Sequence, residues 1–376
     1  MRGRRDFLKG LAGAAGGILF VGCGMAKAAE APLQSASSPR RREVMVNGRR
    51  VTTVDIHCHG QVPEVWELVK DYDLGQQLRG QLDGPLRAGL NLHNVQDRLR
   101  WMDEQGFDVQ AVSINPFWYA AERDLAEAII RLQNEKIAEL CASQPDRFVG
   151  LASIALQYPY LAAEQLEDGV RRLGMRGCLI GGSVNGQELA DPRFHPFWAK
   201  AEELGCVVFI HPQGFPLGDP RFQGNGMLTN VIGNPLETTV ALSHLIFEGT
   251  LDRFPGVKVC AAHGGGYLPS YIGRSDVCGN RSAELCRPVS KPPSEYLKQL
   301  YFDSMVFTDE GLRHLVAEAG ASQIVLGTDY PYGWTHEAVD HILRSPTLSD
   351  ADKEAILGGN AMELLRMRPI SPHRDG

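Results

Sequence analysis

Short apolar runs rich in β-branched residues alternate with longer segments of helical spacing along most of the chain. Short runs bounded by turn-forming residues indicate strands, whereas apolar residues at intervals of three and four indicate helices. The predicted strands are Thr52–His57, Val109–Ile114, Phe148–Ile154, Gly177–Ile180, Val207–His211, Val257–Ala262, Leu300–Ser304 and Ile324–Thr328. The predicted helices between them include Asn94–Gln105, Arg123–Gln144, Tyr160–Leu173, His195–Leu204, Glu237–Asp252 and Asp309–Ala319.

This alternation predicts an α/β protein. Eight strand–helix units of this length favour a (β/α)8 TIM barrel over a doubly wound open sheet. No G-x-G-x-x-G motif opens a helix after the first strand, so the signature of a dinucleotide-binding fold is missing.

Four of the predicted strands end in histidine or aspartate. The first runs into His57 and His59, the fifth into His211, the sixth into His263 and the eighth into Asp329. Alternate residues of a strand point to one face, so His57 and His59 can reach one ion, and barrels carry their chemistry at these carboxyl ends. Each residue alone is more often structural. Together they suit a zinc-like ion with one position left for water.

Composition narrows the class of protein. Hydrophobic residues make up 43% of the 376 residues and charged residues 22%, which is typical of a globular protein. A formal net charge of −7 gives no reason to expect nucleic acid as a partner. The eight cysteines form no C-x-x-C pair, which argues against a disulfide framework or a structural zinc module.

The first residues predict export. Arg4–Lys9 resembles a twin-arginine signal, an apolar run follows from Leu11 to Gly22, and cleavage after Ala28 fits a small-x-small site. The apolar run is too short to span a bilayer. Cys23 only loosely matches a lipoprotein cleavage box. We therefore expect residues 1–28 to be a signal peptide read by the twin-arginine translocation machinery, and the protein to be periplasmic.

The remaining chain divides into three predicted parts. Residues 29–50 are rich in Ser, Pro and Arg and are expected to be a linker, with Arg40–Arg42 solvated. Residues 51–368 are expected to form the barrel, and residues 369–376 a tail.

The motifs resemble the amidohydrolase superfamily, and within it the aminocarboxymuconate-semialdehyde decarboxylase-like branch. They are Asp55–His59, Phe148–Leu151, Phe209–Pro212, Asn234–Thr239, Ala262–Gly266 and Leu326–Pro331, and the resemblance covers nearly all of residues 52–366. It implies that His57, His59, His211 and Asp329 are metal ligands. It also implies that His263 is the acid/base that positions and deprotonates the metal-bound water.

One divalent ion is expected rather than two. Many binuclear members of this superfamily use a carboxylated lysine at the end of strand four, whereas here that strand ends in Leu179–Ser183 without lysine. Zinc is the expected ion, and manganese also fits the ligand set.

The resemblance also suggests how a carboxylic acid substrate is handled. His263 would carry the proton to the carbon that loses carbon dioxide, with Asp329 taking part. Arg274 matches a family arginine that reaches the neighbouring subunit, which implies a homodimer; otherwise it is a surface arginine. A further family arginine has Gly89 at its position here, with Arg87 nearby as a candidate substrate-binding residue.

Three functions remain open at this point. The first is a metal-dependent decarboxylase, a carbon–carbon lyase, acting on an unsaturated or aromatic carboxylic acid. The second is hydrolysis of a lactone, ester or amide at the same site, and the third is a binding protein without activity. The loop Asn225–Asn230 lacks the tryptophan of the family, which argues against the namesake substrate.

Three other features give secondary expectations. Phe117–Tyr119 is expected to cover the rim of the barrel, although it could wall an aromatic substrate. The connection Gln213–Pro235 is long enough for a lid or binding loop. Cys58, between two ligands, should point to the other face as a core thiol.

Overall fold

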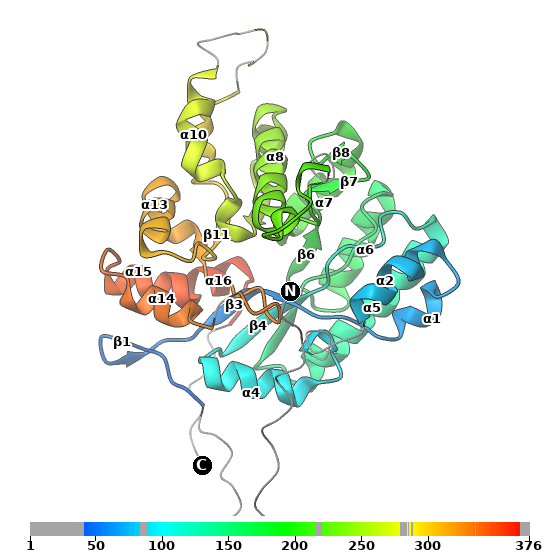
Figure 1. The fold of residues 1–376 in the computed structure, drawn as a ribbon, viewed down its shortest axis with the longest axis horizontal. Helices are drawn as coiled ribbons and strands as arrows, with labels where there is room; N and C mark the ends of the chain where they lie inside the picture. The colour runs from blue at the N-terminus through cyan, green and yellow to red at the C-terminus, as the bar shows by residue number, and fades with distance from the viewer. Residues whose placement is uncertain are drawn as a thin grey trace, which may run out of the picture. The chain divides into compact units, whose positions relative to one another are not determined.

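A computed structural model describes residues 41–82, 89–215, 220–278, 284, 286, 289–334 and 336–368 (Figure 1). The described residues all fall within one compact unit, Pro39–Gly376. Within this part of the chain, no helix combines the length and apolar character that a membrane span requires.

Eight parallel strands form the centre of the described fold. The barrel strands are β3 (Val54–His59), β4 (Val109–Ser113), β5 (Phe148–Gly150), β6 (Gly177–Ile180), β9 (Val207–Ile210), β10 (Lys258–Ala261), β11 (Tyr301–Asp303) and β12 (Ile324–Val325). They form two sheets in the orders β3-β4-β5 and β6-β9-β10-β11-β12. Parallel bridges join the sheets at both edges, between Ala152 and Cys178 and between Cys58 and Tyr330. The ring of strands therefore follows the chain order expected of a (β/α)8 barrel.

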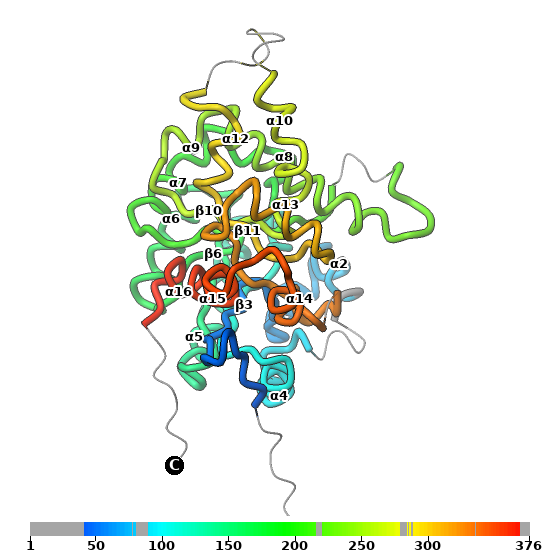
Figure 2. Tube along the Cα trace, turned by 90° about the vertical axis from the view of Figure 1, so that its left-hand side faces the viewer, coloured from blue at the N-terminus to red at the C-terminus, as the bar shows by residue number. Residues whose placement is uncertain are grey.

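Helices alternate with these strands and cover their outer side (Figures 1 and 2). The α-helices are α1 (Val65–Val69), α2 (Asp73–Leu82), α4 (Val95–Gln105), α5 (Arg123–Ser143), α6 (Pro159–Arg171), α7 (His195–Leu204), α8 (Asn234–Phe247), α9 (Thr250–Arg253), α10 (Leu268–Asp276), α12 (Pro293–Tyr296), α13 (Asp309–Ala319), α14 (Ala338–Arg344), α15 (Asp350–Glu354) and α16 (Asn360–Leu364). The short 3-10 helices are η1 (Pro192–Phe194), η4 (His263–Gly265) and η5 (Ala321–Gln323), and the π-helices are η3 (Thr229–Gly233) and η6 (Ala355–Gly359). The short antiparallel strands are β1 (Met45–Val46), β2 (Arg49–Arg50), β7 (Ser183–Val184) and β8 (Gln187–Glu188).

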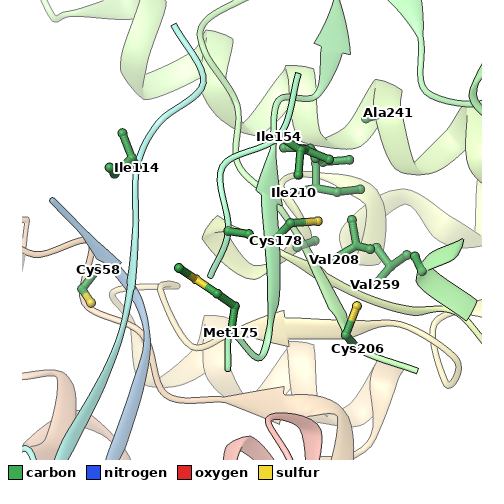
Figure 3. Close-up of a cluster of buried hydrophobic side chains, with 14 of the residues drawn as sticks. Cys58, Ile114, Ile154, Met175, Cys178, Cys206, Val208, Ile210, Ala241 and Val259 are labelled. Atoms are coloured by element: carbon green, nitrogen blue, oxygen red, sulfur yellow. The ribbon is translucent and has the colours of Figure 1, made fainter. Parts of the chain in front are cut away.

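Alternate residues of one strand belong to different parts of the core. Val207 and Phe209 of β9 pack with the cluster inside the barrel. Val208 and Ile210, the residues between and after them, pack with the layer under the helices, which also includes Ala241 of α8 (Figure 3). Both faces of β9 are buried, which is why a parallel barrel strand is a continuous apolar run.

Of the predicted linker, residues 29–40 lie outside the described residues, whereas residues 45–50 form a hairpin that the linker prediction did not include. β1 and β2 form a hairpin in which Met45 pairs with Arg50, and Val46 is 3% exposed. The turn residues Asn47 and Gly48 have φ of 48° and 73°, and an Asn-Gly pair is the strongest short signal for such a turn. That signal, flanked by Val46, could have identified the hairpin from the sequence.

The basic residues beside the hairpin are not solvated as expected. Arg41 pairs with Asp108 at 2.5 Å and Arg42 pairs with Asp340 at 2.5 Å. These ion pairs attach the segment to the barrel. Residues 1–28 and 369–376, expected to be signal peptide and tail, lie outside the described residues.

A disulfide bond joins Cys278 at the end of α10 to Cys286. The cysteine spacing in the sequence predicted no disulfide framework, and this single bond closes only a short loop. The other cysteines of the described chain, Cys58, Cys141, Cys178, Cys206 and Cys260, are free thiols.

Candidate metal centre and active-site cavity

Four side chains from three strand ends converge at the carboxyl end of the barrel. His57 and His59 lie on β3, His211 follows β9 and Asp329 follows β12. Their ligand atoms all lie within 4.8 Å of one another, and all four residues are buried. Asp329 Oδ1 lies 2.9 Å from His59 Nε2, 3.2 Å from His57 Nε2 and 3.9 Å from His211 Nε2. The structure thus brings together the four residues that the sequence proposed as metal ligands.

Backbone geometry aims Asp329 into this cluster. Asp329 has φ of 58°, in the left-handed region that non-glycine residues rarely adopt. The N–H of Asp329 donates to the carbonyl of His57 at 2.8 Å, and the carbonyl of Asp329 accepts from the N–H of Tyr332 at 2.9 Å. These bonds hold the strained Asp329 between the ends of β3 and β12. Such strain is concentrated at functional sites.

The charges of the cluster suit a divalent cation. Burial lowers the pKa of His59 to about 4 and holds the pKa of His211 well below its ordinary value. Burial would raise the pKa of Asp329, but the charge of His57 and the close approach of His263 and His59 outweigh it and hold that pKa well below the usual range. Neutral imidazole and ionised carboxylate are the forms that bind metal ions.

His57 differs from the other two histidines. Burial opposes its positive charge, but Asp329 and Asp303 outweigh burial and raise the pKa of His57 to about 10. Three buried atoms of the four ligand residues, His59 Nδ1, His211 Nε2 and Asp329 Oδ1, have no hydrogen-bond partner among the described residues. Unpartnered buried donors and acceptors are costly unless a ligand satisfies them, so the residues present fit a bound metal ion.

His263 lies beside the four ligand residues. It opens the short helix η4 after β10, and its Nε2 is 3.8 Å from Asp329 Oδ2. Its ring centroid is 5.2 Å from that of His57 and 5.3 Å from that of His211. The structure therefore places His263 next to Asp329, and its acid/base role stays a prediction.

A cavity of about 620 Å³ opens beside the cluster. This volume lies within the range of small-molecule sites. Its lining residues come from strand ends and from the segments that follow them: His59, Gly60, Gln61, Leu90, Ile114, Asn115, Phe117, His211, Pro212, Gln213, Gly214, Met227, Thr229, Asn230, Asn234, Asp329, Tyr332 and Trp334. Among these described lining residues there is no lysine or arginine. His57 and His263 are not among them, and both lie against Asp329.

The match to known proteins settles the family. Residues 54–367 match the amidohydrolase family. The chain belongs to this family. It is 32% identical over 337 residues to 2-amino-3-carboxymuconate-6-semialdehyde decarboxylase of Dictyostelium discoideum, which covers 85% of this chain and 93% of the relative. It is 30% identical over 299 residues to gamma-resorcylate decarboxylase of Rhodococcus jostii (strain RHA1), covering 73% and 89%.

Solved structures give the same fold. The 5-carboxyvanillate decarboxylase of Sphingomonas paucimobilis has a TM-score of 0.78 and 26% identity, covering 85% of this chain and all of that one (100%). A dihydroxybenzoic acid decarboxylase from Polaromonas sp. JS666, which contains bound manganese, has a TM-score of 0.74 and 26% identity, covering 84% and 97%. The predictions of an amidohydrolase, a barrel and an enzyme are confirmed.

Of the two arginines predicted to bind substrate, the structure places only Arg274. Arg274 is exposed on α10, outside the cavity lining, and α10 rises from the top of the view in Figure 1. Arg87 lies outside the described residues. A Cβ at Gly89 would lie 2.8 Å from the Cβ of Pro331, so a longer side chain at this position would require Pro331 to shift.

The aromatic cluster after strand two divides between two roles. Phe117 lines the cavity, which differs from the expected rim cover. Trp118 is fully buried and donates from Nε1 to the carbonyl of Ile154 at 2.8 Å. The hydroxyl of Tyr119 accepts from the N–H of Gly181 at 3.0 Å. Trp118 and Tyr119 therefore hold the loop that presents Phe117.

Two secondary expectations agree with the structure. The connection after β9 supplies cavity residues, among them Gln213, Met227 and Asn230, and extends from the side of the body in Figure 2. Cys58 is fully buried and its Sγ donates to the carbonyl of Ala111 at 3.3 Å, as expected of a core thiol.

Asp303 is a site residue that the sequence reasoning missed. It ends β11, and His57 Nδ1 donates to its Oδ2 at 2.5 Å. Burial would raise the pKa of Asp303, but His57 outweighs burial and lowers it. Its position at the end of the predicted strand Leu300–Ser304 is the same signal that identified Asp329.

Asp55 is a second buried carboxylate that the sequence did not assign. Thr328 Oγ1 donates to it at 2.7 Å and Gln110 Nε2 at 3.0 Å. Its Oδ1 also accepts from the N–H of His57 at 3.1 Å. Burial raises the pKa of Asp55 to about 6 despite these bonds. Asp55 thus links β3 to the segment after β12, close to the candidate metal ligands His57 and Asp329.

Proposed function

We propose that the chain is a metal-dependent decarboxylase that releases carbon dioxide from an aromatic or unsaturated carboxylic acid. The observation that carries this proposal is a buried set of three histidines and one aspartate, of which His59, His211 and Asp329 line a cavity that also contains apolar and aromatic side chains, among them Ile114, Phe117 and Trp334. The names of the relatives support it, because they act on aminocarboxymuconate semialdehyde and resorcylate.

The four ligand residues would hold one divalent ion, zinc or manganese. The end of strand four supports a single ion, because a Cβ at Gly182 would lie 2.5 Å from Cγ of Glu237, leaving little room for a bridging lysine. When bound, the ion would supply positive charge against the substrate carboxylate and orient it. The bound manganese in the Polaromonas structure supports manganese as the ion, and the histidine-rich ligand set equally supports zinc.

The chain's own residues supply two further requirements of the reaction. Phe117 and Trp334 line the cavity and offer apolar faces to a planar substrate. His263 and Asp329 form a pair at 3.8 Å, in which only Asp329 lines the cavity. We expect them to deliver the proton together. In the net reaction the bond to the carboxylate carbon breaks, its electron pair stays on the substrate carbon, and the proton forms the new C–H bond.

Measuring released carbon dioxide tests this proposal. Purified protein loaded with zinc or manganese is incubated with hydroxybenzoates, carboxymuconate-type acids and a panel of lactones and esters. We expect carbon dioxide from at least one carboxylic acid and no hydrolysis of the lactones. Turnover of lactones without any decarboxylation would replace the proposal with the hydrolase.

We also propose that the protein is exported to the periplasm by the twin-arginine machinery. The Arg4-Arg5 motif supports this address. The Cys278–Cys286 disulfide does so as well, because disulfides persist in oxidising compartments. Cell fractionation of the wild type and of the Arg4→Lys/Arg5→Lys double variant tests it. We expect the double variant alone to accumulate in the cytoplasm; equal distribution of both would contradict export by this route.

A homodimer in which Arg274 enters the partner's cavity is the last part of the proposal. Arg274 is exposed, and its neighbours Tyr271 and Val277 on or beside α10 are 68% and 50% exposed, which suits an interface. Mixing Arg274→Ala and His263→Ala chains tests it. A mixed dimer would contain one cavity with both residues intact, so activity should reappear on mixing. A monomer by light scattering, or no recovery, would contradict it.

A further inference from the structure

The carboxylate of Asp303 contacts two parts of the site that the sequence keeps far apart. Its Oδ2 accepts from His57 Nδ1 at 2.5 Å and from the backbone N–H of His263 at 2.9 Å. Its Oδ1 accepts from the N–H of Gly264 at 2.8 Å and of Met305 at 3.1 Å. The side chain of Asp303 is 0% exposed, so these bonds, rather than water, satisfy its charge.

The first contact determines which nitrogen of His57 faces the other ligands. A neutral imidazole carries one proton, and the ring nitrogen that donates a hydrogen bond is the protonated one. With Nδ1 donating to Asp303, the lone pair of a neutral His57 is on Nε2. That atom lies 3.2 Å from Asp329 Oδ1 and 3.1 Å from His59 Nε2. Asp303 therefore orients His57 as a ligand.

The second contact supports the turn that carries His263. His263 has φ of 56° and Gly264 has φ of 62°, so a histidine occupies the left-handed region. This conformation is unfavourable for a non-glycine residue and needs support from its surroundings. The N–H groups of both residues donate to Asp303, which provides that support.

We propose that Asp303 is a positioning residue that couples metal binding to the placement of His263. One oxygen, Oδ2, holds both the ring of a metal ligand and the backbone of the acid/base residue. A change at this atom therefore disturbs both at once. The part of this inference that concerns catalysis rests on the proposed decarboxylase function, whereas the part that concerns the metal does not.

Asp303→Asn is the variant that isolates this role. The asparagine has the same shape and keeps one oxygen for the N–H groups of Gly264 and Met305. Its amide nitrogen, however, meets two donors, His57 Nδ1 and His263 N–H, and accepts from neither. Removing a hydrogen-bond partner of a metal-binding histidine typically lowers metal affinity 10- to 100-fold, roughly the loss we expect here.

Two measurements distinguish coupling from simpler roles. The affinity for Mn²⁺ or Zn²⁺ is measured by competition with a chelator in the absence of substrate. The kcat is then measured at saturating metal. We expect weaker metal binding, and a kcat that stays roughly 10- to 100-fold below that of the wild type even when metal is saturating, because His263 is misplaced.

Asp108→Asn serves as the matched control. Asp108 is also a largely buried carboxylate, with its Oδ2 2.9 Å from the N–H of Thr53, but it lies before β4 at the other end of the barrel. It should lower the melting temperature without changing metal affinity or kcat. If Asp303→Asn behaves like this control, the proposal is wrong. Full recovery of kcat at saturating metal would also overturn the coupling, leaving only orientation of His57.

The test separates this inference from the proposed function. If the wild type decarboxylates no acid, the proposed function fails, whereas the metal-affinity comparison of Asp303→Asn with Asp108→Asn still reports whether Asp303 orients His57.

Discussion

The two ends of the barrel use the same kinds of residue for different purposes. At the amino end, Asp108 accepts from the N–H of Thr53 at 2.9 Å and pairs with Arg50 at 2.7 Å and Arg41 at 2.5 Å. At the carboxyl end, Asp329 Oδ1 lies among three histidines and is buried without a hydrogen-bond partner in the described chain.

The difference lies in how completely each charge is satisfied. At the amino end, Arg41 and Arg50 of the N-terminal segment pair with Asp108. Arg147 pairs with Asp103 at 2.8 Å. Paired charges of this kind hold elements together. At the carboxyl end, unpartnered atoms and left-handed residues are retained, which lowers stability unless a ligand binds. Barrels of this type generally separate stability and chemistry in this way.

The comparison is tested most strongly at the metal ligands. Asp329→Ala or His211→Ala should remove bound metal and reduce turnover to the uncatalysed background, because each removes a ligand from a set of four. Metal content by elemental analysis and turnover are measured together. A variant that keeps a full metal ion would show that the residue is not a ligand.

His263 should affect chemistry without affecting metal binding. We expect His263→Ala to lower kcat by about 10²- to 10⁴-fold, the usual contribution of a general acid, with metal content unchanged. Stopped assays of carbon dioxide release and elemental analysis provide the two values. Wild-type kcat in this variant would remove His263 from the proton pathway.

The amino end should respond in the opposite way. Asp108→Ala leaves Arg41 and Arg50 without their shared partner, and we expect the free energy of unfolding to fall by about 2–4 kcal/mol. Urea unfolding measures this change, and kcat per folded molecule should not change. A large loss of kcat with little loss of stability would break the division between the two ends.

The smallest expected effect is a difference in pH dependence along α8 and α9. Glu237 lies in the first turn of α8, near the carboxyl end of the barrel. Burial raises the pKa of Glu237 above 4.5, so the contribution of this carboxyl group to stability falls as pH rises through its titration. Burial would raise the pKa of Asp252, but Ser290 and Tyr296 outweigh it and lower that pKa below 3.8, so its contribution is lost as pH falls.

Substituting Glu237 and substituting Asp252 should therefore change the pH dependence of stability in opposite directions. Relative to the wild type, Glu237→Gln should become more stable as pH rises above about 4.5, and Asp252→Asn should become less stable as pH rises through the region below 3.8. Unfolding midpoints across this pH range measure both. Equal slopes in the two variants would contradict the assigned environments.

Much of the site was predictable because its residues carry local signals. His211 and Asp329 directly follow apolar runs, and the order of these runs predicts where their ends meet. The helices His195–Leu204 and Asp309–Ala319 have the predicted bounds. The N-terminal hairpin was missed although Asn47-Gly48 signals it, since composition alone suggested a linker.

Other features depended on distant contacts. Asp303 and His57 are separated by 246 positions, and nothing local indicates that they share a hydrogen bond. Whether Phe117 faces the cavity depends on how Trp118 and Tyr119 anchor the loop, through Ile154 and Gly181. The exposure of Arg274 likewise follows from the orientation of α10.

The sequence by itself determined the alternation of strands and helices and the residues at the strand ends, because hydrophobic period and turn residues are local properties. It also indicated the four candidate ligands. Only the tertiary structure decided which atoms meet, that Asp303 holds both His57 and His263, and that the described cavity wall carries no arginine or lysine. These depend on barrel closure, which places residues from opposite ends of the chain within hydrogen-bond distance.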